Sequence, residues 1–86
     1  MWKLEYSDDF LRAARRLDRG VLAQVRQYLL DIVALPDPTV RGKPLTANRR
    51  GYWRYRVGDY RIICEIRRDQ LIVIAITVAH RSEIYR

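Results

Sequence analysis

The residues best suited to chemistry in this sequence are arginines, and most of the surplus positive charge lies in one stretch. The chain has 17 lysine and arginine residues against 10 acidic ones, a formal net charge of +7, and the stretch Arg41–Arg61 alone carries +6. Its basic residues are Arg41, Lys43, Arg49, Arg50, Arg54, Arg56 and Arg61. The planar guanidinium group matches phosphate, and a local surplus of one sign attracts a polyanion. The stretch therefore predicts a phosphate-bearing partner; a solvated face that only keeps the protein soluble is the alternative.

Hairpin pairing is expected to bring three of these arginines together. Gly58-Asp59 separates two runs of β-type alternation and is suited to a two-residue turn. That turn places Arg56 directly opposite Arg61, with Arg54 further along the same face. Like charges opposite one another destabilise a hairpin by about 0.2–1 kcal/mol. We expect the three side chains to serve an anion; the alternative is that they lie over apolar neighbours and pair with acidic residues.

Aromatic and titratable side chains add further candidates. Tyr52 falls on the face of the arginines and can stack on a nucleobase. Alternation along the last strand puts His80, the one histidine, on that face too, and histidine titrates near neutrality. The alternatives are a surface histidine that merely ends a strand and, for Tyr85, an aromatic anchor instead of a stacking platform or proton donor. The proton-transfer residue stays open, with His80 the leading candidate and Glu65 a weaker one.

Composition excludes several classes of protein. A single cysteine, Cys64, cannot form an internal disulfide or a cysteine-based zinc site. No apolar run approaches the roughly 20 residues of a membrane span, and the first residues lack the apolar segment of a signal peptide. With 86 residues, 49% of them hydrophobic and 31% charged, the chain is expected to fold as one domain, residues 1–86, in the cytoplasm.

The elements that must position these residues follow from periodicity. Residues 2–6 are predicted to form a strand, and Ser7 then caps a first helix. The segment 18–20 interrupts that helix, a second helix ends at Pro36, and residues 36–50 form a basic loop. Three strands are predicted to follow, over residues 52–57, 60–67 and 70–78.

This order predicts an α+β domain, in which a helical hairpin packs on one face of a small, mostly antiparallel four-stranded sheet. The last strand is expected to be central, with the first strand on its free side. The sheet face toward the helices is expected to carry Trp53, Tyr55, Val57, Tyr60, Ile62, Cys64 and Ile66.

Three segments of the sequence resemble the RelE/ParE superfamily of toxin–antitoxin toxins. They are Gly42-Lys43-Pro44-Leu45, the stretch Gly51–Ile63, and the tail His80–Tyr85. The resemblance spans nearly the whole chain and implies a RelE-like toxin of a type II system. Such a toxin is an endoribonuclease that cleaves mRNA in the ribosomal A site by metal-independent attack of the 2′-OH, needs no cofactor, and inhibits translation. A ParE-like DNA gyrase poison and a catalytically inactive nucleic-acid-binding member are the alternatives.

The resemblance also implies roles for residues of this sequence. The family's active positions correspond to Arg54, Arg56, Arg61, Arg81 and Tyr85. We expect catalytic roles for Arg61, Arg81, His80 and Tyr85, and RNA or phosphate contacts from Arg54, Arg56, Lys43, Arg49, Arg50 and Tyr52. Arginine replaces the lysine of RelE at positions 54 and 56, and arginine does not deprotonate, so neither is expected to act as a base. The implied partners are an acidic, RelB-like antitoxin together with mRNA and the ribosome, or DNA gyrase in the alternative.

Overall fold

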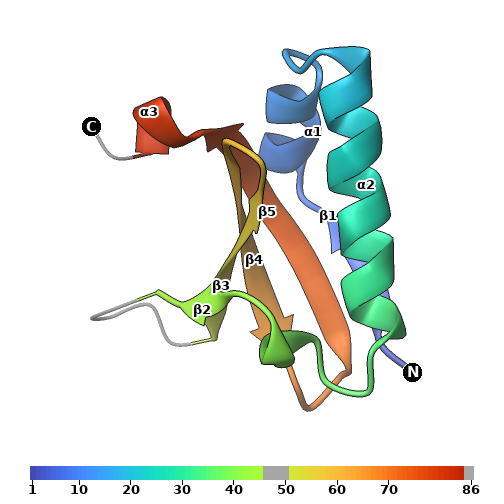
Figure 1. The fold of residues 1–86 in the computed structure, drawn as a ribbon. Helices are drawn as coiled ribbons and strands as arrows, with labels where there is room; N and C mark the ends of the chain where they lie inside the picture. The colour runs from blue at the N-terminus through green and yellow to red at the C-terminus, as the bar shows by residue number, and fades with distance from the viewer. Residues whose placement is uncertain (46–50, 85–86) are drawn as a thin grey trace.

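The computed structural model describes residues 1–45 and 51–84, which form nine elements along the chain (Figure 1). These are β1 (Lys3–Tyr6), α1 (Asp8–Ala14), α2 (Arg19–Ala34), the 3-10 helix η1 (Pro38–Val40), β2 (Lys43–Pro44), β3 (Tyr52–Val57), β4 (Tyr60–Arg67), β5 (Ile72–His80) and α3 (Arg81–Ile84). Within this part of the chain, no helix combines the length and the apolar composition needed to span a membrane.

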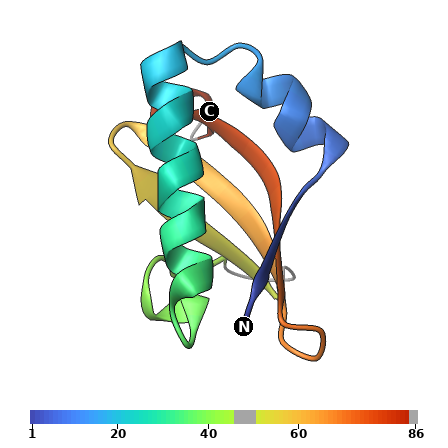
Figure 2. The same cartoon turned by 90° about the vertical axis from the view of Figure 1, so that its right-hand side faces the viewer.

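The strands form one sheet in the order β1-β5-β4-β3-β2, with β1 parallel to β5 and the other neighbours antiparallel. Helices α1 and α2 cover one face, while α3 and β2 lie toward the other, which we call the open face (Figures 1 and 2). The predicted α+β architecture is confirmed. The predicted strand count of four is low by one, because Lys43 and Pro44 pair with β3 instead of remaining in the loop.

Side-chain caps set where α1 and α2 begin. The Ser7 hydroxyl accepts a hydrogen bond from the Phe10 N–H at 3.0 Å and donates one to the Ile76 carbonyl at 2.7 Å, so it both caps α1 and ties it to β5. The Asp18 carboxylate accepts hydrogen bonds from the N–H groups of Gly20 and Val21. The predicted interruption at residues 18–20 is therefore the cap of α2.

The core lies between the helices and the covered face of the sheet. Alternate residues of β3 and β4 point into it, as the hairpin pairing predicted, and Tyr55, Ile62 and Cys64 are fully buried. Val25 and Leu29 of α2 are also fully buried against them. Burial of this face fixes the register of the hairpin, because a slip by one residue would expose the whole apolar set.

A β-bulge interrupts the pairing of β4 with β5. Ile63 lies opposite Thr77 whereas Cys64 lies opposite Ala75, so Ile76 is an extra residue on β5. One inserted residue exchanges the faces of all positions that follow it. In the C-terminal part of β5, the side chains that simple alternation assigns to the open face therefore lie on the covered face, and the reverse.

Candidate nucleic-acid interface

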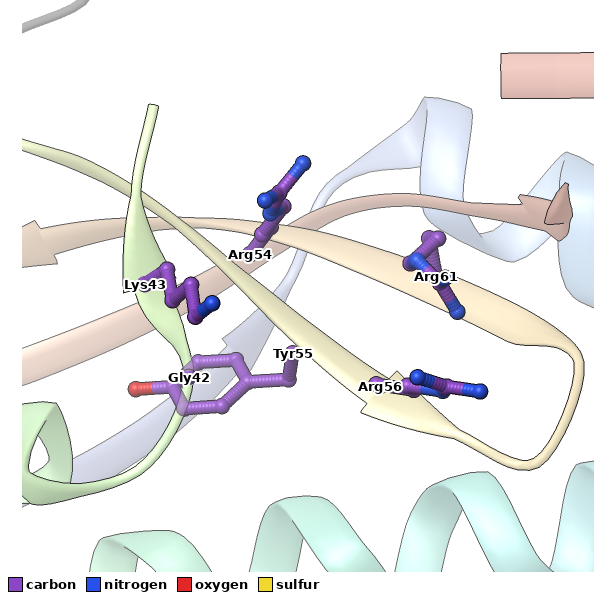
Figure 3. A pocket seen from close by; sticks show the side chains of 6 residues that line it. All are labelled: Gly42, Lys43, Arg54, Tyr55, Arg56 and Arg61. Carbon is purple, nitrogen blue, oxygen red and sulfur yellow. The ribbon is translucent and has the colours of Figure 1, made fainter. Parts of the chain in front are cut away.

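A cavity of about 220 Å³ opens beside β2, β3 and β4 and is lined largely by basic side chains (Figure 3). Its lining residues are Gly42, Lys43, Arg54, Tyr55, Arg56 and Arg61. Three adjacent strands thus contribute four cations to one hollow, which we call the cation pocket. Lys43, Arg54, Arg56 and Arg61 were all predicted as phosphate-binding or catalytic residues, and the structure brings these four together.

The strand register explains why the four side chains meet. Arg56 lies directly opposite Arg61 across the β3–β4 ladder, as predicted, and Lys43 lies directly opposite Arg54 across the β2–β3 ladder. Two cross-strand pairs of like charge therefore occupy neighbouring positions of the sheet. Each such pair lowers hairpin stability by tenths of a kcal/mol, up to about 1 kcal/mol. An anion bound between the strands would offset that cost.

The segment that carries Lys43 is fixed from the covered side of the sheet. The Trp53 indole N–H donates to the Arg41 carbonyl at 2.7 Å, and the Tyr55 hydroxyl donates to the Pro38 carbonyl at 2.8 Å. Burial is the largest cause that raises the pKa of the Tyr55 hydroxyl well above its ordinary value, which keeps this donor protonated. Two aromatic residues of β3 thus hold the backbone that leads into β2.

Gly42 lets this segment lie directly on β3. Its φ angle is +74°, and a Cβ atom there would lie 2.4 Å from the carbonyl oxygen of Arg54 and within 3 Å of the rings of Tyr55 and Trp53. Only glycine fits both the left-handed backbone and this contact. From the sequence, Gly42 is noted only as part of a family motif, and its role in placing Lys43 is missed.

The structure contradicts the prediction that His80 shares a face with the arginines. The bulge in β5 places Ala79 opposite Arg61 and His80 opposite Tyr60, on the covered side. The rings of Tyr60 and His80 are edge to face, with centroids 5.4 Å apart. The His80 Nδ1 atom accepts a hydrogen bond from the backbone N–H of Ser82 at 3.2 Å. His80 does not line the cation pocket.

Arg81 lies next to the end of the pocket formed by Arg56 and Arg61. Its backbone N–H donates to the Asp59 carbonyl at 2.7 Å, which attaches the start of α3 to the β3–β4 turn. Its side chain is exposed and is not part of the pocket lining. The backbone thus brings this predicted catalytic residue beside the β3–β4 turn, and Figure 1 shows that α3, which begins at this residue, lies on the open-face side of the sheet.

Other predicted residues lie away from the pocket or outside the described part of the chain. Tyr52 is half-buried at the opposite end of β3, across from Glu65. Glu65 pairs with Arg67 at 2.7 Å and does not line the pocket, so it is poorly placed as its base. Three predicted residues lie outside the described residues: Arg49, Arg50 and Tyr85.

Among the described residues, neither a reactive thiol nor a metal-binding cluster accompanies the pocket. Burial raises the pKa of the Cys64 thiol to about 12, so the nucleophilic thiolate is disfavoured in the folded protein. Residues 1–45 and 51–84 contain no group of three or more histidine, cysteine, aspartate or glutamate side chains arranged to hold a metal ion. What the described lining residues offer is a concentration of positive charge from four basic side chains.

Comparison with known proteins identifies the family. The model of a family described as "ParE toxin of type II toxin-antitoxin system, parDE" matches residues 2–85. The chain belongs to the RelE/ParE toxin family. This RelE/ParE toxin is 31% identical over 87 residues to Toxin RelG of Mycobacterium tuberculosis, covering 96% of this chain and 99% of the relative.

Solved structures of RelE proteins share the fold of this RelE/ParE toxin. The toxin–antitoxin complex RelBE2 of Mycobacterium tuberculosis contains a chain that matches with a TM-score of 0.84 and 26% identity, over 93% of this chain and 98% of that one. The isolated RelE toxin of Escherichia coli matches with a TM-score of 0.77 and 20% identity, over 99% and 92% of the two chains. The superfamily and the fold predicted from the sequence are both confirmed.

Proposed function

We propose that this RelE/ParE toxin is an endoribonuclease that cleaves mRNA in the ribosomal A site and so stops translation in the cytoplasm. In the reaction, the 2′-oxygen attacks the adjacent phosphate, which yields a 2′,3′-cyclic phosphate and a free 5′-OH. The observation that carries the proposal is the cation pocket, in which three strands contribute four basic side chains to the lining of one hollow.

The pocket suits this reaction because RNA supplies its own nucleophile. The protein then has to orient the chain and stabilise the negative charge that develops on the phosphorane. Arg61 is the best placed for that charge, since it is half-buried and its Nη1 atom is shielded from solvent, where electrostatic interactions are stronger than in water. Arg54 and Arg56 flank it and would hold the neighbouring phosphates.

Further residues complete the proposed RNA path. Arg81, at the rim, would add charge at the scissile phosphate once RNA is bound. Tyr52, further along the open face, would stack on a base. The remaining proposed contacts are from Arg49, Arg50 and Tyr85.

In this reaction the ribosome would position the mRNA for cleavage. Orientation of reacting groups contributes up to about 7–11 kcal/mol to a rate. The pocket supplies charge but has few side chains to orient a mobile RNA strand. We therefore expect weak activity on free RNA and much faster cleavage of mRNA in the A site.

A second proposed partner is a cognate antitoxin that is acidic and resembles RelB. The similar RelBE2 structure is that of a toxin–antitoxin complex. This chain has a net charge of +7, so an acidic partner would gain from electrostatic complementarity. Binding over the cation pocket would remove the like-charge strain and block RNA.

One other candidate function is poisoning of DNA gyrase, the activity that the sequence resemblance implies for a ParE-like member; the matching family model is described as a ParE toxin. The same pocket would then contact phosphate or acidic protein groups without cleaving RNA. A member that binds nucleic acid without any chemistry is the remaining alternative.

The three candidates are separated by expression in cells with mapping of mRNA 5′ ends. The wild type is compared with an Arg61→Ala, Arg81→Ala double variant and with Arg19→Ala, which removes an exposed arginine from the start of α2. The nuclease predicts codon-phased cuts in the wild type and in the Arg19 variant, and none in the double variant. Intact mRNA accompanied by DNA breaks would establish gyrase poisoning instead. Intact mRNA with intact DNA would favour the third candidate, a protein that binds nucleic acid without cleaving it.

A further inference from the structure

We infer that Lys43 is the general acid of the proposed cleavage, donating a proton from Nζ to the 5′-oxygen as that oxygen leaves phosphorus. The inference rests on the proposed function and assigns a step that the arginines cannot perform. Lys43 was expected from the sequence only to contact phosphate.

The composition of the pocket leaves one side chain for proton donation. Arg54, Arg56 and Arg61 hold their protons too tightly to release one during a reaction near neutral pH. Tyr55 also lines the pocket, but its hydroxyl proton is committed to the Pro38 carbonyl at 2.8 Å. Among the described residues that line the cavity, Lys43 alone combines a positive charge with a proton that it can give up.

The position of Lys43 suits this step. It lies directly opposite Arg54, and Figure 3 shows its side chain extending from β2 toward β3. Lysine is usually a poorly positioned donor because its stem is flexible. Here the backbone at its base is held by the close contact of Gly42 with β3 and by the Trp53 hydrogen bond to the preceding segment. The strand that carries the proton donor is thus held directly against the strand that carries Arg54 and Arg56.

The step balances without any other group of the protein. The 2′-hydroxyl loses its proton to hydroxide from solvent, and the 2′-oxygen forms a bond to phosphorus. The bond between phosphorus and the 5′-oxygen breaks, and the electron pair on that oxygen takes a proton from the Lys43 ammonium group. The neutral amine then takes a proton from water, which regenerates the hydroxide. No atom is oxidised or reduced.

The test compares two mRNA substrates on bacterial ribosomes, one with the natural 5′-oxygen at the scissile linkage and one with sulfur in that place. A thiolate leaves without protonation, so the sulfur substrate does not need a general acid. We expect Lys43→Ala to slow single-turnover cleavage of the oxygen substrate by about 10²–10⁴-fold, the usual contribution of a general acid or base. On the sulfur substrate, its rate should return to within about threefold of the wild-type rate. Lys43 is exposed, so its replacement should leave the fold intact, which circular dichroism checks.

Two further variants separate proton donation from charge. Lys43→Arg keeps the positive charge without a releasable proton, and it should behave like Lys43→Ala on both substrates. Arg54→Ala removes the cation on the opposite strand, and it should slow both substrates by the same factor.

The outcomes distinguish this inference from the proposed function. Full activity of Lys43→Arg on the oxygen substrate, or an equal loss on both substrates for Lys43→Ala, would overturn the general-acid role while leaving the nuclease in place. A wild-type protein that cuts neither substrate on ribosomes would overturn the nuclease itself, and the role of Lys43 with it.

Discussion

Replacement of Gly42 by alanine tests how the cation pocket is built. Gly42 has a φ angle of +74°, and a Cβ atom there would lie 2.4 Å from the carbonyl oxygen of Arg54. The nearest atoms also include ring carbons of Tyr55 and Trp53, at 2.8 and 2.9 Å. Backbone and packed aromatic rings cannot move aside as a flexible side chain would, so the substitution must displace the chain that leads into β2.

The cost has two parts that can be separated. The left-handed backbone costs a residue with a Cβ atom about 1–2 kcal/mol. Overpacking against fixed neighbours adds about 1–3 kcal/mol, so we expect Gly42→Ala to lower the free energy of unfolding by about 2–5 kcal/mol. A domain of 86 residues has a total of only about 4–13 kcal/mol. The loss would therefore be a large share of the stability.

Gly58 provides a matched control. Its φ angle is also positive, at +57°, but a Cβ atom there would meet nothing within 4 Å. Gly58→Ala should therefore cost only the backbone part, about 1–2 kcal/mol. Urea unfolding followed by circular dichroism measures both variants on the same scale. A Gly42 variant no less stable than the Gly58 variant would refute the claim that close packing on β3 fixes the Lys43 segment.

Three further substitutions test other parts of the account. Arg56→Thr removes one of two like charges that face each other across the β3–β4 ladder, and should raise the free energy of unfolding by about 0.2–1 kcal/mol in low-salt urea titrations. Ser7→Ala removes the cap of α1 and the hydrogen bond to the carbonyl of Ile76, the bulged residue, and should lower the free energy of unfolding by about 1–3 kcal/mol. Hydrogen bonds from the Thr39 side chain and backbone lower the pKa of the exposed Asp37 carboxyl. The ionised form therefore stabilises the fold above the unfolded pKa near ~4, so Asp37→Ala should be less stable at neutral pH, and the difference should shrink as acid protonates the carboxyl.

Each of these has a result that counts against it. In 1 M salt the Debye length falls to about 3 Å, so repulsion between the two arginines should be screened. An Arg56 variant that is less stable than the wild type at low salt would show that charge repulsion is not the cause. A gain in the free energy of unfolding that stays the same in 1 M salt would show this too. A Ser7 variant as stable as the wild type would mean that the bulge needs no anchor. For Asp37, a stability difference that stays constant from neutral pH into acid would contradict the lowered pKa.

The hairpin at the centre of the pocket was predictable from local rules. Gly58-Asp59 indicates a two-residue turn between β3 and β4, and the alternation of polar and apolar residues indicates which face each side chain occupies. The pairing of Arg56 with Arg61 follows from the two together. The same rules identified the core residues Tyr55 and Cys64, because only one register buries an apolar face.

The parts that sequence reasoning missed depend on contacts between distant segments. A strand of two residues, Lys43 and Pro44, has no periodicity to detect, and its pairing with β3 depends on packing at Gly42. The bulge at Ile76 is anchored by Ser7, 69 positions away, so alternation alone put His80 on the wrong face. In both cases the deciding contact joins segments that are far apart in the sequence, so no local pattern reports it.

The central claim is that the cations of the pocket bind RNA phosphates together, and the salt dependence of RNA binding tests it most directly. The probe is a short single-stranded RNA with 2′-O-methyl groups, which cannot be cleaved. Four phosphate contacts predict a slope of about −2.8 for the logarithm of the binding constant against that of salt concentration, at about −0.7 per contact. We expect Arg56→Ala to reduce the slope to about −2.1, while Arg19→Ala, on α2, leaves it unchanged. Equal slopes for the wild type and the Arg56 variant would contradict the claim.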